Sequence, residues 1–181
     1  MKHRHLAELL FVSAVGLALS ACAGPIILSG HQSMIGANNL QRRAAHAGVD
    51  FGEMHGAPVL AAADGEVASV SERTSGCGIG VLIRHSPFSR YTVYCHLQKA
   101  LVRYGQSVKR GEFIGLVGTT GNAVDIPHVH LELCAYPCAR RNRDGSLATE
   151  DPLAISAGCF DPQKAYPTDR LVLTHPVRCK D

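Results

Sequence analysis

The sequence predicts an all-β domain, an antiparallel β-sandwich or open barrel with short loops. After residue 45, no segment keeps apolar residues at helical spacing. Instead, short apolar runs follow one another, and glycine, proline, aspartate or serine separates them. Short strands between turn signals are typical of antiparallel architectures. The 181 residues are enough for one domain with its own core.

The first residues have the composition of an export signal. A basic start, MKHRH, precedes an apolar run from Leu9 to Leu19. The run is too short for a membrane-spanning helix, which needs ~20 residues. It ends in Leu-Ser-Ala-Cys at residues 19–22, which resembles the lipobox of bacterial lipoproteins, where the chain is cut before the cysteine and the thiol is acylated. An ordinary cleaved signal followed by an unrelated cysteine is the alternative.

The lipobox resemblance divides the N-terminal part of the chain. Residues 1–21 would be a lipoprotein signal peptide, and residues 22–36 would be the lipidated Cys22 and a tether rich in small residues. Ala23 follows the cysteine where an aspartate would retain a lipoprotein in the inner membrane of Gram-negative bacteria. The resemblance therefore implies an outer-membrane lipoprotein of the cell envelope that faces the periplasm.

Turn signals order the elements that follow. Residues 37–45 are expected to form one short helix. The pair Asp64-Gly65 lies between two β-prone runs and predicts a hairpin. Residues 86–89, SPFS, form a second turn between the runs GVLIRH and RYTVYCHL. We expect the folded domain to end near residue 155 and residues 156–181 to form an extension held by its cysteines.

Six cysteines besides Cys22 lie between residues 77 and 179. An even number in an exported domain indicates disulfides. We expect Cys159 to pair with Cys179 and Cys134 with Cys138, although spacing does not determine the connectivity. A structural zinc site formed by these four cysteines is the rival interpretation, which an oxidising compartment disfavours.

The charge pattern excludes a nucleic-acid-binding protein. The formal net charge is only +3, aromatic residues make up 6% of the chain, and no long basic run is present. No second hydrophobic span follows the export signal, so membrane attachment would have to come from the lipid.

The segment IPHVHLEL, residues 126–133, contains two histidines one residue apart. If this run is a strand, side chains alternate between its faces. One face then holds His128, His130 and Glu132. Alone, such a pair most simply indicates a solvated strand face.

Further metal-binding residue types stand elsewhere. The segment HAGVD contains His46 and Asp50; Gly48 and Val49 disfavour a helix, so we expect a loop that leads into a strand carrying Asp50. In the expected strand 91–97, His96 would share a face with Thr92 and Tyr94 by alternation.

Two imidazoles and one carboxylate make a ligand set suited to zinc, with a fourth position left for water. The residues offer His46, Asp50 and one of His128 or His130. His96 and the other histidine of the pair remain for proton transfer and for stabilising an oxyanion. One such open zinc site per chain is what metal-assisted hydrolysis requires.

Four ordered stretches resemble the lysostaphin-type (LytM-like) zinc metalloendopeptidases of bacterial cell walls. They are HAGVDFGEMHGAPVLAAADGEV, YCHL, GQSVKRGEFIGLVGTTGNAVDIPHVHLEL and DPL, and together they span roughly residues 46–153. The resemblance implies that residues 37–155 form the peptidase domain. It also implies His46, Asp50 and His130 as zinc ligands and His96 and His128 as the catalytic pair.

The chain departs from the family pattern in two places. Residues 35–38, IGAN, lack the arginine of the family's Gly-x-Arg element, and the approach to His128 is longer than usual. Glu132 would either support a ligand or be solvated. For the other histidines we expect surface positions for His31 and His175, no role for His55, and a hydrogen-bonded structural position for His85.

The resemblance implies a zinc-dependent peptidoglycan endopeptidase and, for a Gram-negative cell, cleavage of the bond between D-alanine and diaminopimelate. Two alternatives remain. One is a non-catalytic wall-binding regulator of an amidase; the other is a zinc endopeptidase that acts on secreted proteins. The presence of all five polar groups favours the enzyme. The expected partners are peptidoglycan, the membrane through the lipid anchor, and a regulatory protein that the sequence does not identify.

Overall fold

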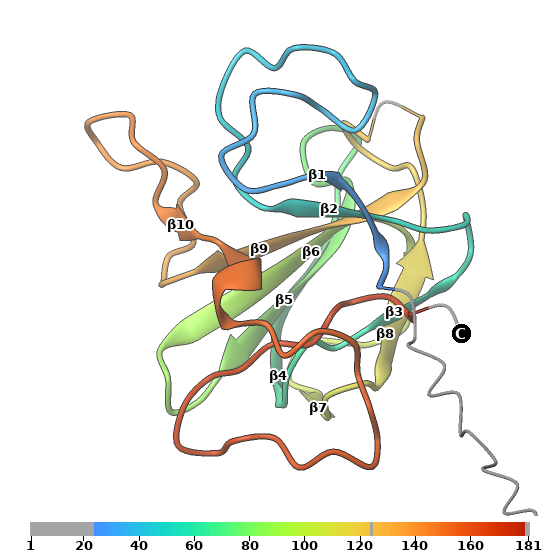
Figure 1. Cartoon of the computed structure of the whole chain (residues 1–181), viewed down its shortest axis with the longest axis vertical. Helices are drawn as coiled ribbons and strands as arrows, with labels where there is room; N and C mark the ends of the chain where they lie inside the picture. The colour runs from blue at the N-terminus through green and yellow to red at the C-terminus, as the bar shows by residue number, and fades with distance from the viewer. Residues whose placement is uncertain (1–23, 124, 180–181) are drawn as a thin grey trace, which may run out of the picture.

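The computed structural model describes residues 24–123 and 125–179, which form an antiparallel sheet with no α-helix among them (Figure 1). The all-β prediction is therefore confirmed. The elements are β1 (Ile26–Ser29), β2 (Val49–Gly52), β3 (Pro58–Leu60), β4 (Gly65–Glu72), β5 (Ile79–His85), β6 (Arg90–Ala100), β7 (Ser107–Val108), β8 (Phe113–Val117), β9 (His128–Cys134), β10 (Thr149–Glu150) and a 3₁₀ turn, Pro152–Ile155.

The long strand β6 is the centre of the sheet. The main strand order is β1-β2-β9-β6-β5-β4-β7, while β10 pairs with β9 and β8 joins β6 to β3. Strands β5 and β6 form the hairpin expected around residues 86–89, with His85 opposite Arg90. Strand β9 lies between β2 and β6, so both neighbours can contribute side chains beside those of β9.

Strand alternation separates an apolar face from a polar face in β2 and β9. Val49 and Phe51 of β2 are buried in the hydrophobic core, whereas Asp50 between them points to the other side. In β9, the core residues are Val129, Leu131 and Leu133. Asp50 is the direct cross-strand partner of His130, so the two polar faces are continuous.

The helix expected over residues 37–45 is wrong. This segment belongs to a long irregular connection, residues 30–48, which also departs from the short loops expected. Asn38 accepts a hydrogen bond from the backbone N–H of Leu40 through Oδ1, and Asn39 takes a left-handed conformation with φ of 59°. Asparagine side chains compete with helix formation by bonding the backbone in this way, which explains the turn.

The tether expected over residues 22–36 is corrected from Ile26 onward. Residues 26–29 form β1, an edge strand that pairs with β2. The hairpin expected at Asp64-Gly65 is also wrong, because β3 pairs with β8 and β4 pairs with β5 and β7. Cys22 and the expected signal peptide lie outside the described residues.

The C-terminal extension, residues 156–179 as described, is part of the core. Leu173 and Val177 are fully buried in the hydrophobic core of the sheet. The backbone N–H of Thr174 donates to the carbonyl of Ala62 (2.8 Å). Figure 1 shows this segment crossing the lower end of the sheet. Position 155 is therefore not a boundary of the packed structure.

All six described cysteines are paired, as expected for an exported domain. The disulfides are Cys77–Cys95, Cys134–Cys138 and Cys159–Cys179. His175 lies near Cys159 and Cys179. The sulfurs of all four cysteines of the rival zinc site are bonded in disulfides, so that site is not formed. No helix long and apolar enough to cross a bilayer occurs in the part of the chain that the structure describes.

Candidate active site

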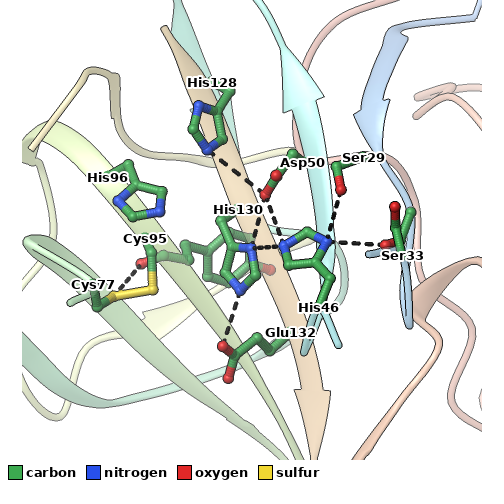
Figure 2. A network of polar contacts seen from close by, with 12 residues as sticks. Ser29, Ser33, His46, Asp50, Cys77, Cys95, His96, His128, His130 and Glu132 are labelled. Atoms are coloured by element: carbon green, nitrogen blue, oxygen red, sulfur yellow. Dashed lines mark hydrogen bonds and ion pairs between the residues drawn. A yellow bond between two sulfur atoms is a disulfide. The ribbon is translucent and has the colours of Figure 1, made fainter. Parts of the chain in front are cut away.

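Three donor atoms converge on the polar face of β2 and β9. Nε2 of His46 lies 3.1 Å from Oδ1 of Asp50 and 2.8 Å from Nδ1 of His130, and that Nδ1 lies 2.8 Å from the same Asp50 oxygen. Figure 2 shows this triangle. The donors around a tetrahedral zinc ion with bonds of ~2.0 Å are about 3.3 Å apart, so the three atoms fit such an ion with little movement.

The remaining nitrogen of each ring forms a hydrogen bond that directs the converging nitrogen into the triangle. Nδ1 of His46 donates to the carbonyl of Gly30 (2.9 Å), the residue that directly follows β1. Nε2 of His130 donates to Oε1 of Glu132 (2.9 Å). Such partners fix the tautomer and the orientation of metal-binding imidazoles.

Arg42 holds the aspartate. Its Nη2 donates to Oδ2 of Asp50 (2.8 Å), which leaves Oδ1 directed at the two histidines. This contact could not be predicted, because Arg42 lies in an irregular segment where no periodicity indicates the direction of a side chain.

His96 and His128 flank the triangle. Their ring centroids are 4.9 Å apart, and that of His96 is 5.9 Å from that of His130. Nδ1 of His96 donates to the carbonyl of Thr120 (2.8 Å), and Nδ1 of His128 donates to the carbonyl of Ile126 (2.7 Å). Each ring therefore has an unprotonated Nε2 that can accept a proton.

Burial sets the charge of these groups. Burial lowers the pKa of His96 to about 4, with smaller contributions from His130 and His128, and burial also lowers the pKa of His128. Both rings are consequently neutral at pH 7. Burial alone would raise the pKa of Asp50, but hydrogen bonds from His130 and His46 outweigh it and hold that pKa well below its usual range.

The carboxylates around His130 raise its pKa, in contrast to the lowered pKa values of His96 and His128. Burial disfavours its protonation, but hydrogen bonds to Asp50 and Glu132 outweigh this and raise its pKa. Burial likewise works against an ionised Glu132, yet His130 and Arg140 lower its pKa.

His96 reaches the site differently from the expectation. Thr92 and Tyr94 point into the core, where the Tyr94 hydroxyl accepts a hydrogen bond from the backbone N–H of Ala62. His96 instead faces the polar side, because an extra residue in β6 breaks the alternation and His96 has a φ of 67°. The expectation that His96 shares a face with Thr92 and Tyr94 is wrong.

Glu132 and the histidines outside the site differ in burial and in hydrogen bonding. Glu132 is buried and bonded to His130, so the solvated alternative is excluded. His85 is fully buried between the carbonyl of Asp64 and the hydroxyl of Thr92, as expected for a structural histidine. His31 and His175 are half-buried and not surface residues; His31 contacts Thr149, and His175 packs against Phe51. His55 is exposed.

The five residues lie at the floor of a groove of about 920 Å³. The long β1–β2 connection forms one wall, and the other lining residues outside the strands include Thr119, Gly121, Asn122, Asp125, Arg140, Arg141 and Leu147. The arginines that line it are Arg42, Arg43, Arg140 and Arg141. Arg42 and Arg140 are engaged with Asp50 and Glu132, whereas Arg43 is exposed and Arg141 donates only to backbone carbonyls.

Known proteins are similar to this chain in sequence and in fold. ShyB of Vibrio cholerae, a peptidoglycan DD-endopeptidase, is 41% identical over 116 residues, which are 64% of this chain and 25% of ShyB. A zinc-containing peptidase from Vibrio cholerae is 37% identical with a TM-score of 0.53, over 62% of this chain and 34% of that one. Lysostaphin from Staphylococcus simulans is 25% identical with a TM-score of 0.59, over 72% of this chain and 49% of lysostaphin.

These relatives are longer than the region they share with this chain. The alignment spans only a quarter of the length of ShyB, so the likeness concerns one domain. The profile of peptidase family M23 matches residues 44–142, more than half of the chain and the region that carries all five site residues. The chain belongs to peptidase family M23, the lysostaphin-type metalloendopeptidases.

Proposed function

We propose that this chain is a zinc-dependent peptidoglycan endopeptidase with His46, Asp50 and His130 as metal ligands. The observation that carries the proposal is the triangle of donor atoms 2.8–3.1 Å apart, flanked by two neutral histidines. The zinc-containing peptidase from Vibrio cholerae supports zinc as the ion, and one ion per chain fits the single triangle among the described histidines and carboxylates.

The metal ion, His128 and His96 would each have a separate role in hydrolysis. Bound zinc would lower the pKa of a water molecule and polarise the scissile carbonyl. Nε2 of His128, 3.6 Å from Oδ1 of Asp50, lies close enough to accept the proton of the attacking water. His96 lies beside it, and once its Nε2 has taken up a proton this ring would stabilise the charge that develops on the carbonyl oxygen. Both rings are held by backbone carbonyls and need no rearrangement to act.

The groove favours a substrate that carries carboxylates. Arg43 and Arg141 have no carboxylate partner among the described residues, so their charges remain available to a ligand. Peptide stems of the Gram-negative wall carry free carboxylates beside their cross-link. We propose that the bond cut joins D-alanine to diaminopimelate, in keeping with the DD-endopeptidase activity named for ShyB.

We further propose that the enzyme is an outer-membrane lipoprotein anchored through Cys22 and facing the periplasm. Cys22 precedes β1 by only three residues, so the anchored domain would lie within ~15 Å of the acylated thiol. Labelling of cells with a fatty-acid probe tests this proposal. Wild-type chain should take up the probe and fractionate with outer membranes, and Cys22→Ser should do neither; labelling that survives this substitution would refute the anchor.

Digestion of isolated sacculi tests the activity. The full chain should release cross-linked peptides as monomers, which mass spectrometry identifies by a new D-alanine carboxyl end. A chelator should abolish release, and added zinc should restore it. Retention on sacculi without any product would instead indicate a wall-binding regulator, and cleavage of secreted proteins alone would indicate the third function class.

Two variants test the residue roles. His128→Ala should abolish release while the protein still binds one zinc equivalent, because it removes a proton acceptor and no ligand. Asp50→Ala should lose both activity and metal, because it removes the charged ligand. Full zinc occupancy in Asp50→Ala would contradict the ligand assignment.

A further inference from the structure

The Cys77–Cys95 disulfide lies against the candidate active site, and the proposed reaction makes no use of it. Cys95 directly precedes His96 and is the cross-strand partner of His130. Figure 2 shows the bond beside both rings. We propose that this disulfide positions the imidazole of His96 for catalysis, a proposal that rests on the role given to His96 in the proposed function.

The position of His96 depends on an extra residue in β6. Strands β5 and β6 pair Val81 with Tyr94 but Ile79 with Leu97, so between these pairs one residue of β5 lies opposite two of β6, Cys95 and His96. Tyr94 and Leu97 both point into the core, and the bulge between them turns Cys95 and His96 to the polar face. At this bulge His96 has a left-handed backbone conformation with a φ of 67°, which few residues other than glycine adopt unless the surrounding structure enforces it.

Cys77 holds both residues of the bulge. Its sulfur is bonded to Cys95, and its backbone carbonyl accepts a hydrogen bond from the backbone N–H of His96 (2.8 Å). The bulge is thus tied covalently at one residue and by a hydrogen bond at the next. Bulges beside active sites often re-aim a side chain in this way.

The loop that carries Cys77 is itself fixed to the loop that binds the His96 ring. The backbone N–H of Gly76 donates to Oδ1 of Asn122 (3.1 Å), and the N–H of Asn122 donates back to the carbonyl of Gly76 (3.0 Å). A Cβ atom on Gly121 would lie 2.5 Å from that Gly76 carbonyl oxygen, so the loops are in direct contact. Thr120, two residues before Asn122, accepts the hydrogen bond from Nδ1 of His96.

These contacts form a closed ring that runs from Cys95 through Cys77 and the 119–122 loop back to His96. Without the disulfide, β6 can relax toward regular alternation, which would direct residue 96 to the core side. The ligand residues would stay in place, because Gly30, Arg42 and Glu132 hold them. Loss of the bond should therefore impair catalysis and spare metal binding.

Kinetics of disulfide variants of the full chain test the proposal, with a soluble cross-linked muropeptide dimer as substrate. In Cys77→Ala/Cys95→Ala, kcat should fall roughly a hundredfold, as expected when one group that stabilises the developing charge is lost, with KM and one bound zinc equivalent unchanged. The matched control is Cys159→Ala/Cys179→Ala. That bond closes a separation of 20 residues against 18, so its removal relaxes the unfolded chain similarly, but kcat should remain at the wild-type value.

The outcomes separate this proposal from the proposed function. Wild-type kcat in Cys77→Ala/Cys95→Ala, together with an inactive His96→Ala, would overturn the positioning role and leave the enzyme assignment intact. Loss of zinc together with kcat, or an equal loss in the control pair, would also overturn it. Full activity of His96→Ala would refute the role of His96 itself.

A second measurement applies if the double variant does not fold. A phosphine cleaves each disulfide of the native chain into two thiols, with water as the source of hydrogen and oxygen, and is itself oxidised to the phosphine oxide. Mass spectrometry measures the reduced fraction of each pair. Activity should fall in proportion to Cys77–Cys95 reduction and return on reoxidation; full activity after complete reduction of this pair would overturn the proposal.

Discussion

Glu132 accepts hydrogen bonds from Nε2 of His130 (2.9 Å) and from Nε of Arg140 (2.7 Å) through the same oxygen. The carboxylate is buried, two residues after the ring that it contacts, on the same face of β9. It fixes the tautomer in which Nδ1 of His130 points at Asp50 and His46. The negative charge also makes that nitrogen a better ligand for a cation.

Replacing Glu132 should weaken metal binding without removing a ligand. Glu132→Gln keeps a hydrogen-bond acceptor but loses the charge, and we expect about a tenfold lower zinc affinity; Glu132→Ala should lose about a hundredfold. Competition with a chromophoric chelator measures both affinities. Glu150→Gln, which breaks an exposed pair with Arg90, is the control and should bind zinc normally. An unchanged affinity in both Glu132 variants would show that the carboxylate does not support the site.

Acid should destabilise the metal-free protein through His96. Its pKa is about 4 in the folded chain against 6.5 ordinarily, so between these values the unfolded chain binds a proton that the folded chain does not. The contribution of His96 to the free energy of unfolding is fully present above pH 6.5. It is lost as the pH falls to 4, which lowers the free energy of unfolding by about 3 kcal/mol. Urea unfolding of chelator-treated protein at both pH values measures this loss.

His96→Gln isolates that contribution. The variant cannot titrate at this position, so its loss of stability between pH 6.5 and 4 should be smaller than that of the wild type by about 3 kcal/mol. Other buried histidines with lowered pKa values, such as His85, affect both proteins equally. Parallel pH profiles for the two proteins would be inconsistent with a buried neutral His96.

Neutralising the free arginines of the groove should affect substrate binding and not chemistry. For Arg43→Gln/Arg141→Gln we expect KM for a muropeptide dimer to rise by roughly tenfold with kcat unchanged, because these side chains reach the substrate but not the donor triangle. A dimer with its free carboxylates amidated serves as the matched substrate. An equal rise in KM for both substrates would argue against recognition of carboxylates.

Local patterns in the sequence anticipated much of the site. Alternation in short strands whose apolar residues, such as Phe51 and Leu131, point into the core places Asp50 and both histidines of the pair on the polar face. The choice of His130 over His128 as a ligand came only from the family resemblance. His96 shows the limit of that argument, because a period of two cannot reveal an extra residue in a strand. Arg42 was missed because it reaches Asp50 from an irregular loop.

Long-range pairing was the other part that the sequence did not reveal. Strand β1, with the sequence IILS, shows no alternation of apolar and polar residues, and its assignment depends on pairing with β2. The Asp64-Gly65 signal was local, whereas β3 pairs with β8 some fifty residues later along the chain. Leu173 and Val177 likewise enter a core formed by much earlier residues. Local propensity carries no information on such contacts.

The core position of Leu173 predicts that the C-terminal extension stabilises the whole domain. Leu173 is fully buried, so Leu173→Ala should lower the free energy of unfolding by about 3 kcal/mol through lost burial and the cavity left behind. Leu153→Ala is the control, because this side chain is 36% exposed and should cost far less. Urea unfolding in the presence of chelator measures both variants without a contribution from metal binding. Equal costs for the two substitutions would mean that the extension only lies on the surface of the sheet and that the domain is complete without it.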